Sequence, residues 1–125
     1  MNLFENLRKY AVIPVIAIES ANDALPLADA LIKGGLPVAE ITFRTAAAAD
    51  AIGTIRKERP DMIVGAGTLL TKENVDQAVL CGAHFGVAPG LNPDIVKHAA
   101  TQDLPFIPGV ATPTDIEAAI RLGIT

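Results

Sequence analysis

The chain has 125 residues, of which 50% are apolar and 19% are charged, and its formal net charge is −4. This length and composition are typical of one folded domain with a real core and exclude a disordered chain. The ten lysines and arginines are scattered, with no basic block and no tryptophan, which argues against a nucleic-acid partner, and no apolar run is long enough to span a membrane.

The first predicted elements are a short helix at about residues 2–10 and a strand over 12–18. The apolar run before Glu19 superficially resembles a secretory signal, but it contains Pro14 and is followed by no small-residue cleavage pattern. We therefore interpret it as a strand. Further strand-like runs begin about 22 to 25 residues apart, the spacing of successive strand–helix units. They cover 37–43, 61–67, 84–89 and 105–110.

Helical periodicity fills the segments between these strands. Apolar residues recur at i, i+3, i+4 and i+7 in three of them. The residues concerned are Ala24, Leu27, Ala28 and Leu31, then Ala48, Ala51, Ile52 and Ile55, and later Ile116, Ala119, Ile120 and Gly123. Asn92 and Thr112 each precede a proline and are predicted N-caps. The predicted helix ends are Gly34–Gly35, Gly82 and Gly123.

Alternating strands and helices with short connections predict a parallel sheet. Two architectures fit, an open five-stranded flavodoxin-like sheet and the start of an eight-unit TIM barrel. The chain ends at Thr125, where a sixth strand is expected to begin, whereas a flavodoxin-like domain is expected to end with its last helix. We predict that residues 1–125 are the N-terminal part of a single (β/α)8 TIM-barrel domain, with a short N-terminal helix and about the first five βα units.

The single cysteine, Cys81, is predicted to be a small buried residue near a helix end. It has no partner for an internal disulfide, which fits a reducing cytosol and predicts a cytoplasmic location. His84 is a weak candidate for a base that activates this thiol and is interpreted as a strand-end residue. The sequence contains no zinc-ligand spacing, no G-x-S-x-G elbow and no Walker-type loop.

The run VAEITFRT, residues 38–45, predicts a buried strand that nevertheless carries two charges. Because side chains alternate along a strand, Glu40, Thr42 and Arg44 share one face and the apolar residues between them share the other. In a parallel barrel the apolar face meets the surrounding helices and the charged face points inward. Arg44 then lies at the C-terminal end, where barrel enzymes build their sites. An internal ion pair between Glu40 and Arg44, or a solvated strand end, explains the same pattern.

The run VGAGTLL ends the third predicted strand with Gly65, Gly67 and Thr68. Glycines there let the backbone approach a ligand closely, and the Thr68 hydroxyl can donate a hydrogen bond. A tight turn is the alternative, and the run is not a dinucleotide fingerprint. The later runs VAPGLNP and IPGVATPT are predicted to shape a rigid rim above the barrel mouth, although ordinary turn chemistry explains them equally.

Together, VIPVI, EITFRT, IVGAGTLL, VAPGLNP and IPGVATPT resemble the family of 2-keto-3-deoxy-6-phosphogluconate (KDPG) aldolases. This family includes bifunctional enzymes that also cleave 4-hydroxy-2-oxoglutarate (KHG). The resemblance covers nearly the whole chain and implies a TIM barrel, a homotrimer and a class I aldolase without metal or cofactor. The implied reactions yield pyruvate with glyceraldehyde 3-phosphate from KDPG, and pyruvate with glyoxylate from KHG. The expected partners are these small molecules, not nucleic acid or a membrane.

The same resemblance implies roles for four residues. Glu40 matches the family's general acid/base, which moves protons during carbinolamine formation and at the pyruvyl methyl carbon. Arg44 and Thr68 match residues that bind the pyruvyl carboxylate and orient the substrate. Pro89 matches a rim residue that lines the same pocket.

The family's Schiff-base lysine lies on the sixth strand, in a segment resembling K-x-F-P, and this chain ends at Thr125, a few residues before it. The lysines present fall in predicted helices or at helix ends, where solvated positions are expected. They are Lys9, Lys33, Lys57, Lys72 and Lys97. We therefore expect catalysis from the intact protein and not from these residues alone. The expected phosphate-binding loops also lie outside the chain, which leaves open the preference between KDPG and KHG.

The sequence allows two other functional classes to be compared with the aldolase. A non-catalytic half-barrel that assembles with another chain through its open sheet edges fits the same strands and helices. A flavodoxin-like receiver or ligand-binding module is disfavoured. Receivers need an acidic cluster after the first strand and an aspartate at the end of the third, where this chain has IES and GAGT.

Overall fold

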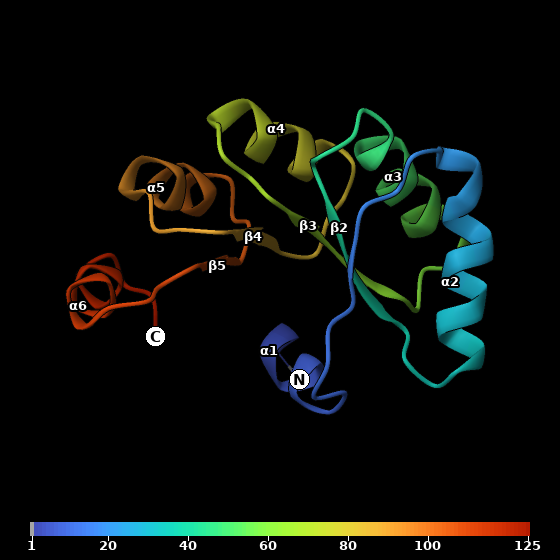
Figure 1. Cartoon of the computed structure of the whole chain (residues 1–125), viewed down its shortest axis with the longest axis horizontal. Helices are drawn as coiled ribbons and strands as arrows, with labels where there is room; N and C mark the ends of the chain where they lie inside the picture. The colour runs from blue at the N-terminus through green and yellow to red at the C-terminus, as the bar shows by residue number, and fades with distance from the viewer. Residues whose placement is uncertain (1) are drawn as a thin grey trace.

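The computed structural model describes residues 2–125 and contains five parallel strands that alternate with helices (Figure 1). The strands are β1 (Val15–Ile16), β2 (Val38–Thr42), β3 (Ile63–Gly67), β4 (Gly86–Ala88) and β5 (Phe106–Pro108). The helices are α1 (Leu3–Arg8), α2 (Ala24–Lys33), α3 (Ala48–Glu58), α4 (Lys72–Leu80), α5 (Pro93–Thr101) and α6 (Pro113–Arg121), with a short 3-10 turn, η1 (Ala21–Asp23), before α2. Within this described part of the chain, no helix is long and apolar enough to cross a membrane.

The order of the strands in space decides between the two predicted architectures. The sheet runs β1-β2-β3-β4-β5, and every neighbouring pair is parallel. A flavodoxin-like sheet departs from chain order at its switch point, with the second strand outside the first. A TIM barrel adds each new strand on the same side of the last one and keeps the helices outside. The chain is therefore α/β and forms the first five βα units of a TIM barrel, and the flavodoxin-like alternative is wrong.

Two apolar cores lie on opposite faces of this sheet. The larger lies between the sheet and the outer helices and includes Ile41, Val64 and Ile52. The smaller joins Leu7 of α1 to Val38 and other residues of the opposite face. Figure 1 shows α2 to α6 in an arc around the sheet, with α1 on the inner side. Because Val38 begins β2, α1 covers the N-terminal end of the inner face and leaves the C-terminal end to other side chains.

The predicted helix boundaries are confirmed by the caps. The Asn92 side chain accepts a hydrogen bond from the Asp94 backbone N–H at 3.0 Å, and Thr112 forms a capping box at the start of α6. Gly35, Gly82 and Gly123 follow three helices with φ angles of 80°, 81° and 81°. Such left-handed conformations favour glycine, which explains why each helix stops there.

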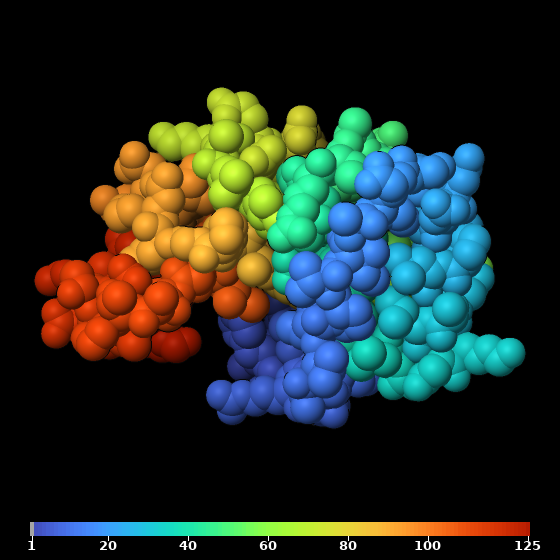
Figure 2. Space-filling view, in the orientation of Figure 1, coloured from blue at the N-terminus to red at the C-terminus, as the bar shows by residue number. Residues whose placement is uncertain are grey.

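The structure differs from the prediction at both edges of the sheet. Strand β1 has two residues where 12–18 was predicted, and β5 has three where 105–110 was predicted. Each edge strand has a neighbour on one side only, and Pro14 and Pro105 have no N–H to donate. The helix predicted from the pattern at Ile116, Ala119, Ile120 and Gly123 is confirmed by α6, in which Ala119 is buried and Ile120 is 62% exposed. Figure 2 shows α6 at one end of the molecule.

Candidate active site

The C-terminal half of the inner face carries the predicted site. In the parallel register, Glu40 lies beside Val15 of β1 and Gly65 of β3, and Thr42 lies beside Gly67. Residues paired in this way point to the same side of a sheet. Glu40 and Thr42 are both buried, and they are the buried polar or charged residues among those that the structure describes.

The predicted alternation of faces along β2 is confirmed. Ala39 and Ile41 belong to the core under the outer helices, whereas Val38, two residues before Glu40, belongs to the inner core with α1. Glu40 therefore points to the inner face, away from the helices that cover the sheet from outside.

Burial changes the acid–base behaviour of Glu40. Loss of water around the carboxyl group raises its pKa, and the nearby positive charge of Arg44 offsets part of this rise. The two groups are not in direct contact. Within residues 2–125, the oppositely charged pairs within 4.0 Å are Lys57–Glu58, Arg59–Asp29 and His98–Asp76. The alternative of a direct ion pair between Glu40 and Arg44 is therefore wrong.

Two glycines of β3 provide the space that Glu40 and Phe85 occupy. A methyl group built on Gly65 would lie 2.3 Å from the Phe85 ring, and one built on Gly67 would lie 1.9 Å from Glu40 Oε1. Both glycines lie inside a regular strand, so the tight-turn alternative is wrong. Side chains of the protein itself, Phe85 and Glu40, lie over these two glycines.

Hydrogen bonds between β1 and β2 hold the segment that carries Arg44. The Thr42 Oγ1 donates to the Ile16 carbonyl at 3.2 Å, and the Thr45 Oγ1 donates to the Ile18 carbonyl at 2.5 Å. Arg44 itself follows β2 and is exposed at the C-terminal end of the sheet. These flanking threonines were not predicted as part of the site. The signal was a hydroxyl residue on either side of Arg44, each within reach of the neighbouring strand.

Thr68 follows β3 with a φ of 60°, in the left-handed region that a β-branched residue rarely adopts. The chain is held on both sides of it. The Phe43 N–H donates to the Gly67 carbonyl at 2.7 Å, and the Leu69 N–H donates to the Val87 carbonyl at 3.0 Å. Thr68 is thus fixed at the end of β3, next to the end of β2 that leads to Arg44.

Pro89 follows β4 and is exposed on the rim. The chain after β5 comes very close to it, because a methyl group built on Gly109 would lie 2.1 Å from the Pro89 carbonyl oxygen. The two strand ends line a cavity of about 420 Å³ together with Leu91, Val110 and Asp115. The structure thus places Arg44, Thr68 and Pro89 just after the C-terminal ends of three successive strands, with Glu40 in the middle of the first of these, β2.

None of the chain's lysines lies on the inner face with Glu40. All five are exposed and belong to helices or helix caps, as predicted. Metal ligands are not gathered there either. Within the described part of the chain, no group of three or more histidine, cysteine, aspartate or glutamate side chains could hold a metal ion.

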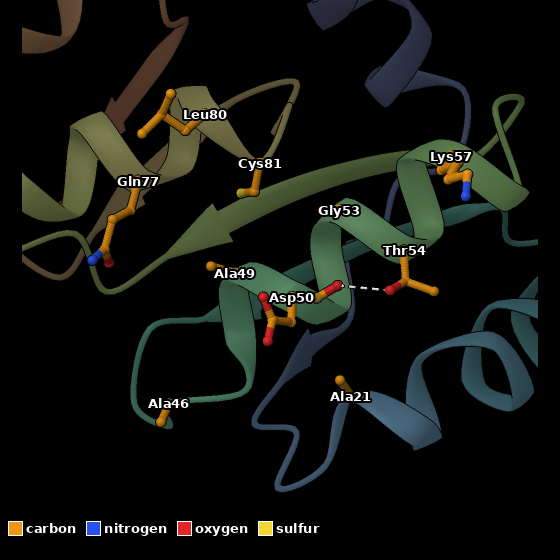
Figure 3. Close-up of a pocket in the computed structure, with 10 residues that line it drawn as sticks. All are labelled: Ala21, Ala46, Ala49, Asp50, Gly53, Thr54, Lys57, Gln77, Leu80 and Cys81. Atoms are coloured by element: carbon orange, nitrogen blue, oxygen red, sulfur yellow. Dashed lines mark hydrogen bonds between the residues drawn. The ribbon is translucent and has the colours of Figure 1, made fainter.

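A surface groove of about 790 Å³ lies elsewhere, between α3 and α4 on the outer side of the sheet (Figure 3). It is lined mainly by small or polar side chains and includes Cys81. Burial raises the pKa of the Cys81 thiol, and its Sγ donates to the Ala78 carbonyl at 3.3 Å. His84 contacts Arg56 Nη1 at 2.8 Å through its Nε2. Cys81 is therefore an unreactive thiol at a helix end, as predicted, and not an activated nucleophile.

Residues 3–125 match the model of the family described as KDPG and KHG aldolase. The 2-dehydro-3-deoxy-phosphogluconate aldolase of Haemophilus influenzae is 53% identical over 123 residues, which are 98% of this chain and 58% of that protein. The KDPG aldolase of Zymomonas mobilis, solved with 3-phosphoglycerate, has a TM-score of 0.90 and 44% identity over 98% of this chain and 58% of its own. The KDPG aldolase of Legionella pneumophila, solved with pyruvate as a covalent carbinolamine, has a TM-score of 0.85 and 38% identity over 89% and 54%.

The present chain thus spans less than two thirds of the length of these relatives. The match with the family nevertheless extends over nearly every residue of the chain, and the solved relatives share its fold at high similarity. The chain belongs to the KDPG and KHG aldolase family.

Proposed function

We propose that the intact protein that carries this chain is a class I aldolase, a lyase that cleaves KDPG to pyruvate and glyceraldehyde 3-phosphate. The observation that carries the proposal is the buried Glu40 carboxyl on the inner face, beside the strand ends where Arg44 and Thr68 lie. Membership of the KDPG and KHG aldolase family supports the same reaction.

Glu40 is the general acid/base of this proposed reaction. In a class I aldolase an amine of the enzyme condenses with the substrate ketone, and the iminium accepts the electron pair of the carbon–carbon bond that breaks. The carbon left behind must then take up a proton. Because burial raises the pKa of Glu40, its carboxyl holds a proton at higher pH than an exposed glutamate does. It can give this proton to the pyruvyl carbon and regain one from the substrate hydroxyl, which loses its proton as the aldehyde forms.

Arg44 and Thr68 bind the carboxylate of the pyruvyl group. A guanidinium matches a carboxylate with two parallel hydrogen bonds, and the Thr68 hydroxyl adds a third donor. Arg44 is held by the threonine hydrogen bonds on either side of it, and Thr68 by the backbone bonds around it. Pro89 forms a rigid part of the pocket wall. Such a prebuilt pocket aligns the reacting atoms before the bond breaks.

The Schiff-base lysine of the proposal lies on the sixth strand of the intact protein. Residues 1–125 are then the N-terminal part of a single TIM-barrel domain and are inactive by themselves. The exposed helical positions of all five lysines in the chain support this assignment, because none of them shares the inner face with Glu40.

Reductive trapping tests this proposal. The intact protein is incubated with pyruvate and sodium borohydride, and its mass is measured beside that of the 125-residue chain treated in the same way. We expect a reduced pyruvyl adduct on the intact protein only. An intact protein that forms no adduct would overturn the aldolase assignment, and an adduct on the 125-residue chain would overturn the assignment of the lysine.

KHG is proposed as a second substrate, cleaved to pyruvate and glyoxylate. The family description, which names both activities, supports it. Both substrates share the pyruvyl half that Glu40, Arg44 and Thr68 are proposed to hold, and they differ in the half that becomes the aldehyde. Coupled assays of pyruvate release from KDPG and KHG at equal concentrations give the ratio of kcat/KM directly. No release from KHG would limit the enzyme to KDPG.

The assembly is proposed to be a homotrimer in the cytoplasm. Leu80 is 86% exposed on the outer side of α4, which supports contact with another copy.

A non-catalytic half-barrel that pairs with another chain is the competing function, and the unpaired edges of β1 and β5 favour it. Light scattering of the intact protein and of the 125-residue chain separates the two. The aldolase proposal predicts that the intact protein is a trimer and cleaves its substrate. The half-barrel alternative predicts that the 125-residue chain forms oligomers by itself and does not bind pyruvate.

A further inference from the structure

Gly67 lies diagonally across from Glu40, two residues beyond its register partner Gly65, and its missing side chain decides where the Glu40 carboxyl lies. A methyl group built on Gly67 would lie 1.9 Å from Oε1, 2.7 Å from Cδ and 2.9 Å from Cγ of Glu40. Three successive atoms of the glutamate therefore lie flat against this one residue. Distances this short do not occur between real Cβ atoms and their neighbours, so any side chain at position 67 must displace one of the two partners.

The backbone of β3 is not free to make room. The Gly67 carbonyl accepts a hydrogen bond from the Phe43 N–H at 2.7 Å, on the side of β2. On the other side, the Ala66 N–H donates to the Phe85 carbonyl at 2.9 Å. With β3 bonded to strands on both of its edges, the collision is relieved at lower cost by rotation of the Glu40 side chain.

The Phe85 ring blocks the other direction that Glu40 could take. Gly65 is the residue of β3 directly beside Glu40, and the ring occupies the space over it, 2.3 Å from where a methyl group would be. Phe85 is fully buried in the inner core, and its ring fills the space over the register partner of Glu40. The carboxyl can therefore lie within the protein over Gly67, or turn outward into solvent.

We propose that Gly67 is a positioning residue for Glu40 in the aldolase reaction: the bare backbone of β3 at this position, above the Phe85 ring, holds the carboxyl where it exchanges protons with the substrate. This inference rests on the role proposed for Glu40. It gives Gly67 a function in a strand where its φ does not require glycine.

The test is the variant Gly67→Ala in the intact protein. A reacting group misplaced by about 1 Å loses about 100-fold in rate, and we expect kcat to fall by that factor. The KM for KDPG should change little, because Arg44 and Thr68 are untouched. NMR titration of 13C-labelled glutamate side chains gives the second readout. The pKa of Glu40, raised in the wild type by burial, should move back toward its ordinary value.

An unchanged Glu40 pKa in a folded Gly67→Ala protein would overturn the inference, and so would an unchanged kcat in an active enzyme. The NMR measurement does not depend on turnover. If Glu40 of the wild type titrates with a raised pKa but the protein cleaves no KDPG, the proposed function is wrong. The inference that Gly67 positions the Glu40 carboxyl is then still supported. Gly53→Ala is the matched control, because a methyl group there meets nothing closer than the Cys81 carbonyl at 4.0 Å.

A second cycle keeps the inference falsifiable if Gly67→Ala does not fold. Glu40→Ala removes the atoms with which the new methyl group collides, so the double variant Glu40→Ala/Gly67→Ala should fold. In denaturant titrations the Gly67→Ala change should then cost much less stability in the Glu40→Ala background than in the wild type. An equal loss of stability in both backgrounds would show that glycine is needed at position 67 for the strand itself and not for the position of the Glu40 side chain.

Discussion

The two faces of strand β2 carry out different tasks with neighbouring residues. Ile41 points outward and is fully buried under the helices, whereas Glu40, the residue before it, points inward and is a buried ionisable residue. Burial of an isoleucine contributes about 1.5–3 kcal/mol to folding. Burial of a carboxyl without a direct ion pair opposes folding. The apolar outer face therefore stabilises the fold, and this stability offsets the cost of burying most of the Glu40 side chain on the inner face.

The largest expected effect concerns the inner face. Glu40→Gln keeps the shape of the side chain but removes the proton that it exchanges. General acid/base catalysis contributes about 100- to 10,000-fold, so kcat for KDPG cleavage in the intact protein should fall by that range. Glu117→Gln, at an exposed position of α6, is the control and should leave kcat unchanged. Full activity of the Glu40 variant would show that the inner face of β2 has no catalytic role.

The next effect concerns the outer face. Ile52 of α3 is fully buried against the sheet, and Ile52→Ala should lower the free energy of unfolding by about 2–5 kcal/mol. Ile120→Ala on α6 removes the same atoms from a side chain that is 62% exposed, and it should change stability by about 0.5 kcal/mol or less. Urea titration of both variants gives the comparison. Equal losses would contradict the difference in burial between Ile52 and Ile120.

Arg44→Lys tests the geometry at the mouth of the inner face. Lysine keeps the charge but cannot form two parallel hydrogen bonds with a carboxylate. Loss of one such charged bond is worth about 1.5–3 kcal/mol, so KM for KDPG should rise about 10- to 100-fold. Arg121→Lys at the exposed end of α6 is the matched control. An unchanged KM would show that Arg44 does not bind the substrate carboxylate.

The pH dependence of stability should distinguish the inner face from its surroundings. Because the folded-state pKa of Glu40 lies above its ordinary value of 4.5, the folded protein binds more protons than the unfolded chain between these two values. Stability from this group is then present below pH 4.5 and is lost as the pH rises through the folded-state pKa. Glu40→Gln should flatten this slope and be more stable than the wild type at neutral pH. Urea titrations between pH 4 and 8 measure both, and an identical slope in the variant would contradict the raised pKa.

The smallest effect is expected from His84, which contacts the Val64 backbone and Arg56 of α3. Burial and, to a lesser extent, the Arg56 charge lower the pKa of His84 below its ordinary value of 6.5. The unfolded chain binds this proton more readily, so stability is full above pH 6.5 and is lost as the pH falls through the folded-state pKa. His84→Gln should remove this acid-side slope without changing the slope due to Glu40. Loss of both slopes in the variant would show that the two groups are coupled.

Much of the fold could be predicted because its signals are local. The four apolar residues of the α3 pattern, Ala48, Ala51, Ile52 and Ile55, are the buried residues of that helix. The caps at Asn92 and Thr112 and the glycines after the helices depend on a few neighbouring residues. The edge strands were predicted less well, because their length depends on what lies beside them and not on their own periodicity.

The sequence by itself determined the alternation of Glu40 with Ile41 and the order of helices and strands, because alternation and capping act over a few residues. Only the tertiary structure decided that β2 lies between β1 and β3, which rules out a flavodoxin-like sheet. It also decided that the Glu40 carboxyl lies on Gly67 above the Phe85 ring, without a direct ion pair with Arg44. These contacts join residues far apart in the chain, and their geometry is set by strand register, which no local pattern encodes.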